Sequence, residues 1–155
     1  MINWPVLHLS SWLKTCCNTS AYSGFFFLSG RTIDQPEEIR GMLGRFWERH
    51  LKALEFAPPF PQQTLPVYLH GDEGRGQGKR PILVISFQPV MPWFGENEVN
   101  SSKHTFTTRA LYTVVPSANY APKGGTLKEL LAALRDDLNS LFETGFEASW
   151  LTFNM

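Results

Sequence analysis

Two apolar runs on either side of a glycine-rich segment restrict the fold of this chain more than any other feature. The runs are Val67–Leu69 and Ile82–Phe87, and β-branched and aromatic residues dominate both. Pro66 and Pro81 stand at their starts, where the missing amide donor of proline costs least. The pattern predicts a long β-hairpin, with Asp72 near the C-terminal end of its first strand.

Composition predicts one folded domain that is not basic as a whole. The chain has 155 residues, of which 43% are hydrophobic and 18% charged, and its 14 basic and 14 acidic residues give zero net charge. This balance argues against a nucleic-acid binder that uses its whole surface. The region from Arg75 to Gly125 is locally basic, which indicates either a positive face on the sheet or a solvated hairpin tip.

The cysteines and the apolar runs bear on where the protein works. Cys16 and Cys17 are adjacent, so they provide no disulfide framework, and no further ligand stands at metal-binding spacing around them. The longest early apolar stretch, Phe25–Leu28, is far too short for a membrane span, and no secretory leader is evident. We expect an intracellular protein without a membrane segment.

A first amphipathic helix is predicted over residues 34–56. Asp34 is a credible N-cap, Pro36 suits the first turn, and Gly41 and Gly44 suggest close packing against another element. Before this helix, Leu7, Leu9, Trp12 and Leu13 fit either a short helix or a strand. The apolar stripe of the predicted helix consists of Ile39, Met42, Leu43, Phe46, His50 and Leu54.

A third strand from His104 to Val115 is followed by a second helix from Thr126 to about Thr144. Thr126 and Glu129 have the spacing of a capping box, and Gly145 suits the position after the helix end. Asp136 and Asp137 are expected on its solvated flank. Its apolar face, which should lie on the sheet, consists of Leu127, Leu130, Leu131, Leu134, Leu138, Leu141 and Phe142.

Asp72 is the strongest candidate for chemistry. Because side chains alternate along a strand, Tyr68, His70 and Asp72 should share one face. A carboxylate at a strand end can bind magnesium, and two-metal phosphoryl transfer needs several such carboxylates to converge. The alternative is that Gly71–Gly74 is only the turn of the hairpin. The glycines match neither the P-loop nor the dinucleotide-binding pattern.

The stretch YLHGDEGRGQGKRPILVISFQP, followed by KHTFTTRALYTVVPS and TLKELLAALRDDLNSLFE, resembles a high-copy family of transposon-like open reading frames. The order of a strand with an aspartate, a glycine-rich turn, two antiparallel strands and a helix also resembles the opening of the ribonuclease H-like fold. That fold is shared by ribonucleases H, retroviral-type integrases and DDE transposases.

The resemblance implies roles for individual residues. Asp72 matches the metal-binding aspartate of the first strand. Glu73 and His70 are weaker candidates by residue type alone, and a strand histidine such as His70 is more often simply hydrogen-bonded. Glu129 is similar in context to a helix glutamate of the ribonuclease H branch, although the helical geometry points it away from the sheet. The basic residues Arg75, Lys79 and Arg80 would contact DNA phosphates, and a transposase would work in the nucleus.

We therefore expect an α/β (α+β) chain: an N-terminal helical extension over residues 1–61, then a truncated ribonuclease H-like β-β-β-α unit over 62–155. The Asp72 strand should be central, with the third strand on the far side of its partner. The expected function is a fragment of a DDE-type transposase core, inactive alone, whose missing C-terminal half or another protein is a partner. The alternative is a non-catalytic interaction module that docks through Trp93, Phe94 and the apolar tail.

Overall fold

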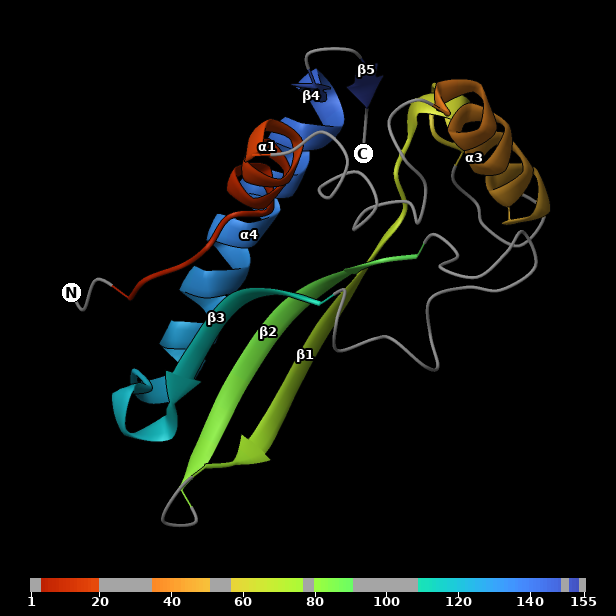
Figure 1. Cartoon of the computed structure of the whole chain (residues 1–155). Coiled ribbons are helices and arrows are strands. Elements are labelled where there is room, and N and C mark those ends of the chain that lie inside the picture. The colour runs from red at the N-terminus through yellow and green to blue at the C-terminus, as the bar shows by residue number, and fades with distance from the viewer. Residues whose placement is uncertain are drawn as a thin grey trace.

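A computed structural model of the chain describes residues 4–19, 35–50, 57–76, 80–90, 109–148 and 151–153 (Figure 1). It combines helices with a three-stranded antiparallel open sheet that is followed by a long helix, as the predicted α+β class requires. The elements in chain order are α1 (Leu9–Thr19), α3 (Pro36–His50), β1 (Val67–Arg75), β2 (Pro81–Pro89), β3 (Ala110–Pro116), α4 (Gly125–Thr144), β4 (Phe146–Ala148) and β5 (Leu151–Phe153).

The large sheet has the order β1-β2-β3, and β4 and β5 form a separate two-stranded sheet. The predicted hairpin is present, with Val67 opposite Pro89 and Arg75 opposite Pro81. β3 lies on the far side of β2, as expected. The central position expected for the Asp72 strand is wrong in the described part of the chain, because β1 pairs there only with β2 and forms an edge.

A bulge in β3 determines which of its side chains enter the core. The register with β2 shifts between Ile85 and Ser86, which leaves Tyr112 without an opposite residue. Tyr112 and Thr113 are therefore both buried, although strict alternation would place them on opposite faces. Leu111 and Val114, on the other face, are exposed.

α4 packs against one face of the sheet, with α1 beside it (Figure 1). Of its predicted apolar face, Leu130, Leu134 and Leu141 are buried in the core. The prediction is wrong for Leu127, Leu131 and Phe142, which are exposed. At about 100° per residue the apolar arc is wider than the contact with the sheet, so the side chains on one side of it stay partly exposed.

The two ends of α4 differ from each other in how well the sequence predicted them. The capping box is wrong: Gly124, at φ 72°, is the N-cap and no side chain bonds there. Thr126 Oγ1 accepts instead from the backbone N–H of Ala121 at 2.6 Å. Gly145, at φ 68°, ends the helix as predicted, and its N–H donates to Leu141 O at 2.9 Å.

α3 buries Ile39, Met42 and Leu43, as its stripe predicted, but the prediction is wrong for His50, which is exposed at the end of the helix. Asp34 and residues 51–56 lie outside the described residues. The close packing predicted for a helix glycine holds at Gly44, where an added Cβ would lie 3.3 Å from Gln62 Cγ. Trp47 Nε1 donates to Thr64 O at 2.8 Å and holds α3 at the start of β1.

The N-terminal residues take the helical alternative and join the same core. Leu9 and Leu13 of α1 are buried in one cluster with Ile39 of α3 and Phe87 of β2. Ahead of α1, residues 4–8 follow the outer edge of β3, where Leu7 N donates to Tyr112 O at 2.8 Å. In the part of the chain that the structure describes, no helix has the length and apolar character to cross a membrane.

Candidate functional site

Asp72 lies within β1, opposite Val84, and its side chain is exposed. The alternative reading of Gly71–Gly74 as the hairpin turn is wrong, because all of these residues pair with Ile82–Ile85 of β2. Glycine and aspartate favour turns only as a tendency, and the strong β2 partner strand extends the pairing through them. Asp72 is the sixth of the nine residues of β1, so the prediction that it stands near the C-terminal end of its strand is wrong: the pairing continues to Arg75.

The two neighbouring carboxylates of β1 face opposite sides of the sheet. Burial first, and then the nearby Glu73 carboxylate, raise the pKa of the Tyr120 hydroxyl. That hydroxyl makes no hydrogen bond of standard geometry. Tyr120 packs against the core, which lies on the α4 side of the sheet. Because Glu73 is close to the Tyr120 hydroxyl, its side chain faces that same side. Because side chains alternate, Asp72 faces away from α4.

His70 and Tyr68 lie on the same face as Asp72. Their ring centroids are 6.1 Å apart, in agreement with the alternation predicted for this strand. The Nε2 atom of His70 is buried and has no hydrogen-bond partner. The face therefore presents an imidazole two residues from an exposed carboxylate.

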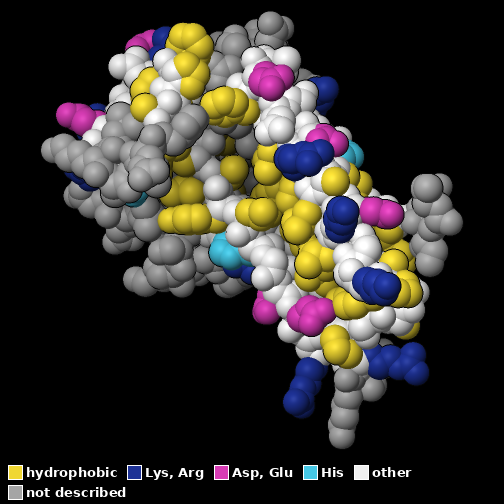
Figure 2. Space-filling model, turned by 180° about the vertical axis from the view of Figure 1, so that it is seen from behind, with side chains coloured by type: hydrophobic (Ala, Val, Ile, Leu, Met, Phe, Trp, Pro, Cys, Tyr) yellow, Lys and Arg dark blue, Asp and Glu magenta, His cyan; other side chains and the backbone are white. Residues whose placement is uncertain are grey.

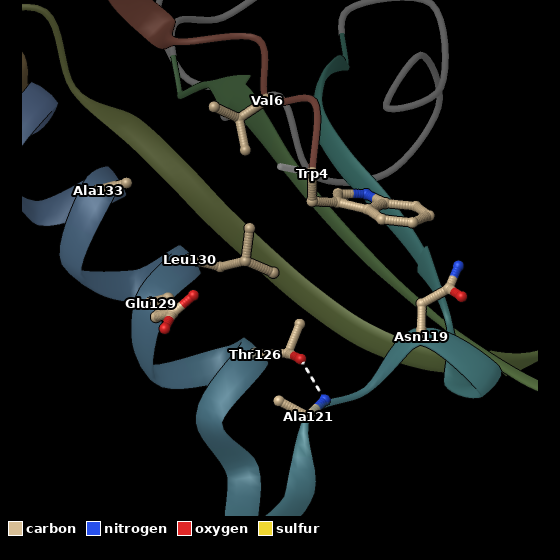
Figure 3. A pocket seen from close by; sticks show the side chains of 8 residues that line it. All are labelled: Trp4, Val6, Asn119, Ala121, Thr126, Glu129, Leu130 and Ala133. Atoms are coloured by element: carbon tan, nitrogen blue, oxygen red, sulfur yellow. Dashed lines mark hydrogen bonds between the residues drawn. The ribbon is translucent and has the colours of Figure 1, made fainter. Parts of the chain in front are cut away.

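Glu129 lies elsewhere, beside the N-terminal segment. It is exposed, as helical geometry predicted, and it borders a hollow of about 280 Å³ between the start of α4 and the chain before α1. Figure 3 shows its carboxylate on the helix and Trp4 on the opposite wall. The other lining residues are Val6, Asn119, Ala121, Thr126, Leu130 and Ala133. β1 contributes nothing to this lining, so Glu129 and Asp72 do not form one site.

The basic candidates flank the hairpin tip. Arg75 ends β1 and Arg80 precedes β2, and both are exposed; Lys79 lies outside the described residues. Gly76 N donates to Arg80 O at 2.8 Å, and an added Cβ on Gly76 would come within 2.8 Å of Ile82 Cγ2. Figure 2 shows Lys and Arg side chains at this end of the molecule. Because both arginines are exposed, they can contact an anionic surface.

These positions do not fit the magnesium centre that the resemblance implies. Two-metal chemistry needs carboxylates that converge, whereas Asp72, Glu73 and Glu129 face three different surroundings. Among the described residues, no three His, Cys, Asp or Glu side chains lie together in a way that could hold a metal ion. No metal-dependent step follows from this set.

One polar junction was missed by the sequence reasoning. Asp137, predicted on a solvated flank, is nearly buried and accepts from Ser10 Oγ at 2.6 Å and from Ser10 N at 3.3 Å. It thus caps α1 from another helix, with His8 Nδ1 3.8 Å away. The sequence did contain one sign of this burial: Asp137 follows the buried Leu130 by seven residues, which places both on nearly the same side of α4. The prediction holds for Asp136, which is exposed and bound by Arg135 at 2.7 Å.

A partly exposed apolar surface adjoins β1. We call Leu127, Leu131, Leu138 and Phe142 the α4 stripe; the first, second and fourth are 43%, 44% and 39% exposed. It leads into a groove of about 400 Å³ at the start of β1, lined by Trp47, Thr64, Leu65, Pro66, Val67, Leu138, Asn139 and Phe142. Figure 2, which views the molecule from behind, shows apolar side chains around a hollow on this face.

Comparisons with protein-family models, with curated proteins and with solved structures returned no match. The resemblance to transposon-like proteins therefore stays a prediction. The aromatic loop with Trp93 and Phe94, the histidine His104 and Trp150 of the tail lie outside the described residues.

Proposed function

We propose that this chain is the opening part of a ribonuclease H-like, DDE-type nuclease or transposase core, and that it is catalytically silent by itself. The observation that supports the proposal is the order β1-β2-β3, all antiparallel, followed by α4 on one face. A carboxylate, Asp72, stands on β1 just past its centre, and β1 is the strand to which the family resemblance assigns a metal ligand.

The free side of the sheet adds support. Among the residues that the structure describes, no strand pairs with the outer edge of β1 and, next to it, the α4 stripe is exposed. A further strand and helix added at β1 would cover both. In intact relatives that addition would supply the acids that this chain does not bring to Asp72. The exposed Arg75 and Arg80 would neutralise phosphate charge on DNA.

Manganese tests the assignment of Asp72. A single carboxylate binds a divalent cation weakly, so millimolar Mn²⁺ should broaden the amide NMR signals around Asp72 and the opposite Val84. Asp72→Asn should remove this broadening. Glu73→Gln is the matched control, because its carboxylate faces the other side and the broadening should persist. Equal broadening in natural protein and Asp72→Asn would remove the main support for the proposal.

DNA binding tests the basic tip. Arg75→Gln with Arg80→Gln should weaken binding to duplex DNA and flatten its dependence on salt by about one unit of log–log slope for each phosphate that is no longer neutralised. Fluorescence anisotropy at several salt concentrations measures both. Binding that ignores salt, or that survives the double change, would contradict a role of the tip.

A non-catalytic interaction module is the second candidate, and the α4 stripe favours it. Exposed apolar side chains in a row on one helix are typical of surfaces that dock a partner. An Asp72→Asn variant that retains every binding property of the natural chain would favour this candidate over the first.

A further inference from the structure

We propose that the outer edge of β1 pairs with the same edge of a second copy of this chain, so that two open sheets join into one. The proposal does not rest on the proposed function. It rests on three features of the described residues. The first is the set of backbone groups that β1 points outward, the second is that the side chains of β1 complement those of an identical strand running in the opposite direction, and the third is the α4 stripe beside it.

The hydrogen bonds of the hairpin show which backbone groups are free. Gly76 N donates to Arg80 O, and at the other end Val90 N donates to Pro66 O at 3.0 Å. In an antiparallel pair the bonded residues alternate, so even-numbered residues of β1 bond to β2. The N–H and C=O groups of the odd-numbered residues point to the outer edge. These residues are Val67, Leu69, Gly71, Glu73 and Arg75.

A two-fold axis at Gly71 pairs β1 of one copy with β1 of the second copy along the whole length of the strand. The odd-numbered residues then pair with odd-numbered ones, so that every outward donor meets an outward acceptor. All nine residues of β1 take part, because Val67 falls opposite Arg75 of the second copy. Leu69 falls opposite Glu73, with the aliphatic part of the glutamate against the leucine.

The other face is complementary as well. In this register Asp72 falls opposite His70 of the second copy, and a ring N–H of the imidazole can donate to the carboxylate. Tyr68 falls opposite Gly74, and an aromatic ring over a cross-strand glycine is a favourable pair. These residues form non-hydrogen-bonded pairs, whose side chains are closest, at a Cα separation of about 4.5 Å.

Neighbouring registers are less favourable. A shift of two residues in one direction places Asp72 opposite Asp72 of the second copy, and like charges directly opposite destabilise a sheet. The same shift in the other direction places His70 opposite His70. Either shift also shortens the pairing from nine residues to seven.

The α4 stripe explains why the pairing would be stable. A two-fold axis through Gly71, perpendicular to the sheet, leaves both copies of α4 on the same face. Leu131 and Leu138, on the β1 side of each helix, then turn toward the other copy. A stable interface needs about 1,000 Å² or more, which one strand edge does not provide, and the two stripes add apolar area. Lys128 and Arg135 stay at the outer border of the stripe.

A cysteine at the axis gives a specific test. Gly71 and Gly74 both have open space where a Cβ would stand, and neither has a left-handed φ. In the proposed dimer the two Gly71 Cα atoms lie about 5.5 Å apart, within the range of a disulfide, whereas two Gly74 Cα atoms lie about 20 Å apart. In a Cys16→Ser, Cys17→Ser background, Gly71→Cys should form a disulfide-linked dimer at least about tenfold faster than Gly74→Cys.

Sedimentation of the natural chain provides the independent measurement. It should show a concentration-dependent dimer, which Leu131→Glu weakens about tenfold or more. The control is Leu111→Glu, which places the same charge on a leucine of similar exposure on the other face of the sheet. A monomer at all concentrations, equal cross-linking of the two cysteine variants, or a monomer that instead binds a foreign helix or strand would overturn the proposal.

Discussion

The two outer edges of the three-stranded sheet differ in whether other described residues cover them. The edge of β3 is covered by residues from the start of the chain, whereas the odd-numbered residues of β1 have no backbone partner in the described residues. The contacts on β3 are Trp4 Nε1 to Val114 O at 3.1 Å, Leu7 N to Tyr112 O at 2.8 Å, Trp12 Nε1 to Leu111 O at 2.8 Å and Thr113 Oγ1 to Pro5 O at 3.0 Å.

This difference shows which edge of the sheet the described residues cover and which edge they leave open. A strand edge attracts other strands, and proteins cover it, shorten it or charge it. The chain covers one edge by its own N-terminal segment and anchors that cover in the core. At the other edge it leaves Leu69 48% exposed beside the exposed α4 stripe. We expect stability to depend on the first edge and association on the second.

The largest effect should come from the anchor of the covered edge. Leu13→Ala removes a fully buried side chain of α1, and such changes cost about 2–5 kcal/mol. Urea denaturation measures the loss. Leu131→Ala, on the exposed stripe, should cost less than about 1 kcal/mol in dilute solution. Equal losses would show that α1 does not anchor the cover.

The cap between α1 and α4 should matter next. Asp137→Ala removes the acceptor of both Ser10 bonds and should lower the free energy of unfolding by about 1–2 kcal/mol, as loss of a helix cap does. The neighbour Asp136 is the control, because its exposed pair with Arg135 is worth at most about 1 kcal/mol. Thermal denaturation compares the two. An Asp136→Ala variant that is the less stable one would contradict this geometry.

Tyr112 makes the covered side sensitive to alkali. Burial, and then the Asp137 charge, raise its pKa. A raised folded-state pKa gives stability that is present below the unfolded value, near pH 10, and is lost as the pH rises through the folded value. Tyr112→Phe should cost about 1 kcal/mol at pH 7, since it removes the hydrogen bond to Leu130 O, and should flatten the decline above pH 10. Chemical denaturation at several pH values tests this, and an unchanged slope would refute it.

The smallest effect on folding should come from the open edge. Leu69→Glu replaces an exposed side chain, so stability in dilute solution should change by no more than about 0.5 kcal/mol. The same change should abolish the dimer, because it places a carboxylate directly opposite Glu73 of the second copy, and like charges directly opposite destabilise a sheet. Sedimentation at high concentration measures the second effect. A strongly destabilised Leu69→Glu monomer would mean that this edge is already covered.

Local patterns predicted the elements well and their neighbours poorly. The hairpin, the burial of Ile39, Met42 and Leu43, and the glycine end of α4 follow from residues close together in sequence. The cover of β3 does not, because Trp4 and Val114 are 110 positions apart. The bulge at Tyr112 likewise depends on the partner strand and leaves no sign in the sequence of β3 alone.

In the candidate site, too, local patterns were predicted correctly and long-range contacts were not. Alternation along β1 was enough to place Asp72, His70 and Tyr68 on one face. It was not enough to predict that Glu73 faces Tyr120 or that Glu129 borders the hollow beside Trp4. Asp137 was expected with Asp136 on the solvated flank of its helix, and only the tertiary contact with Ser10 shows otherwise.

Amide hydrogen exchange tests the contrast between the two edges most directly. We predict that the N–H groups of Leu69, Gly71 and Glu73 exchange rapidly in dilute protein and become protected as the concentration rises. The Leu7 N–H and the core amides of β3 should be protected at every concentration. Protection of the three β1 amides in dilute monomer, or exchange that ignores concentration, would contradict it.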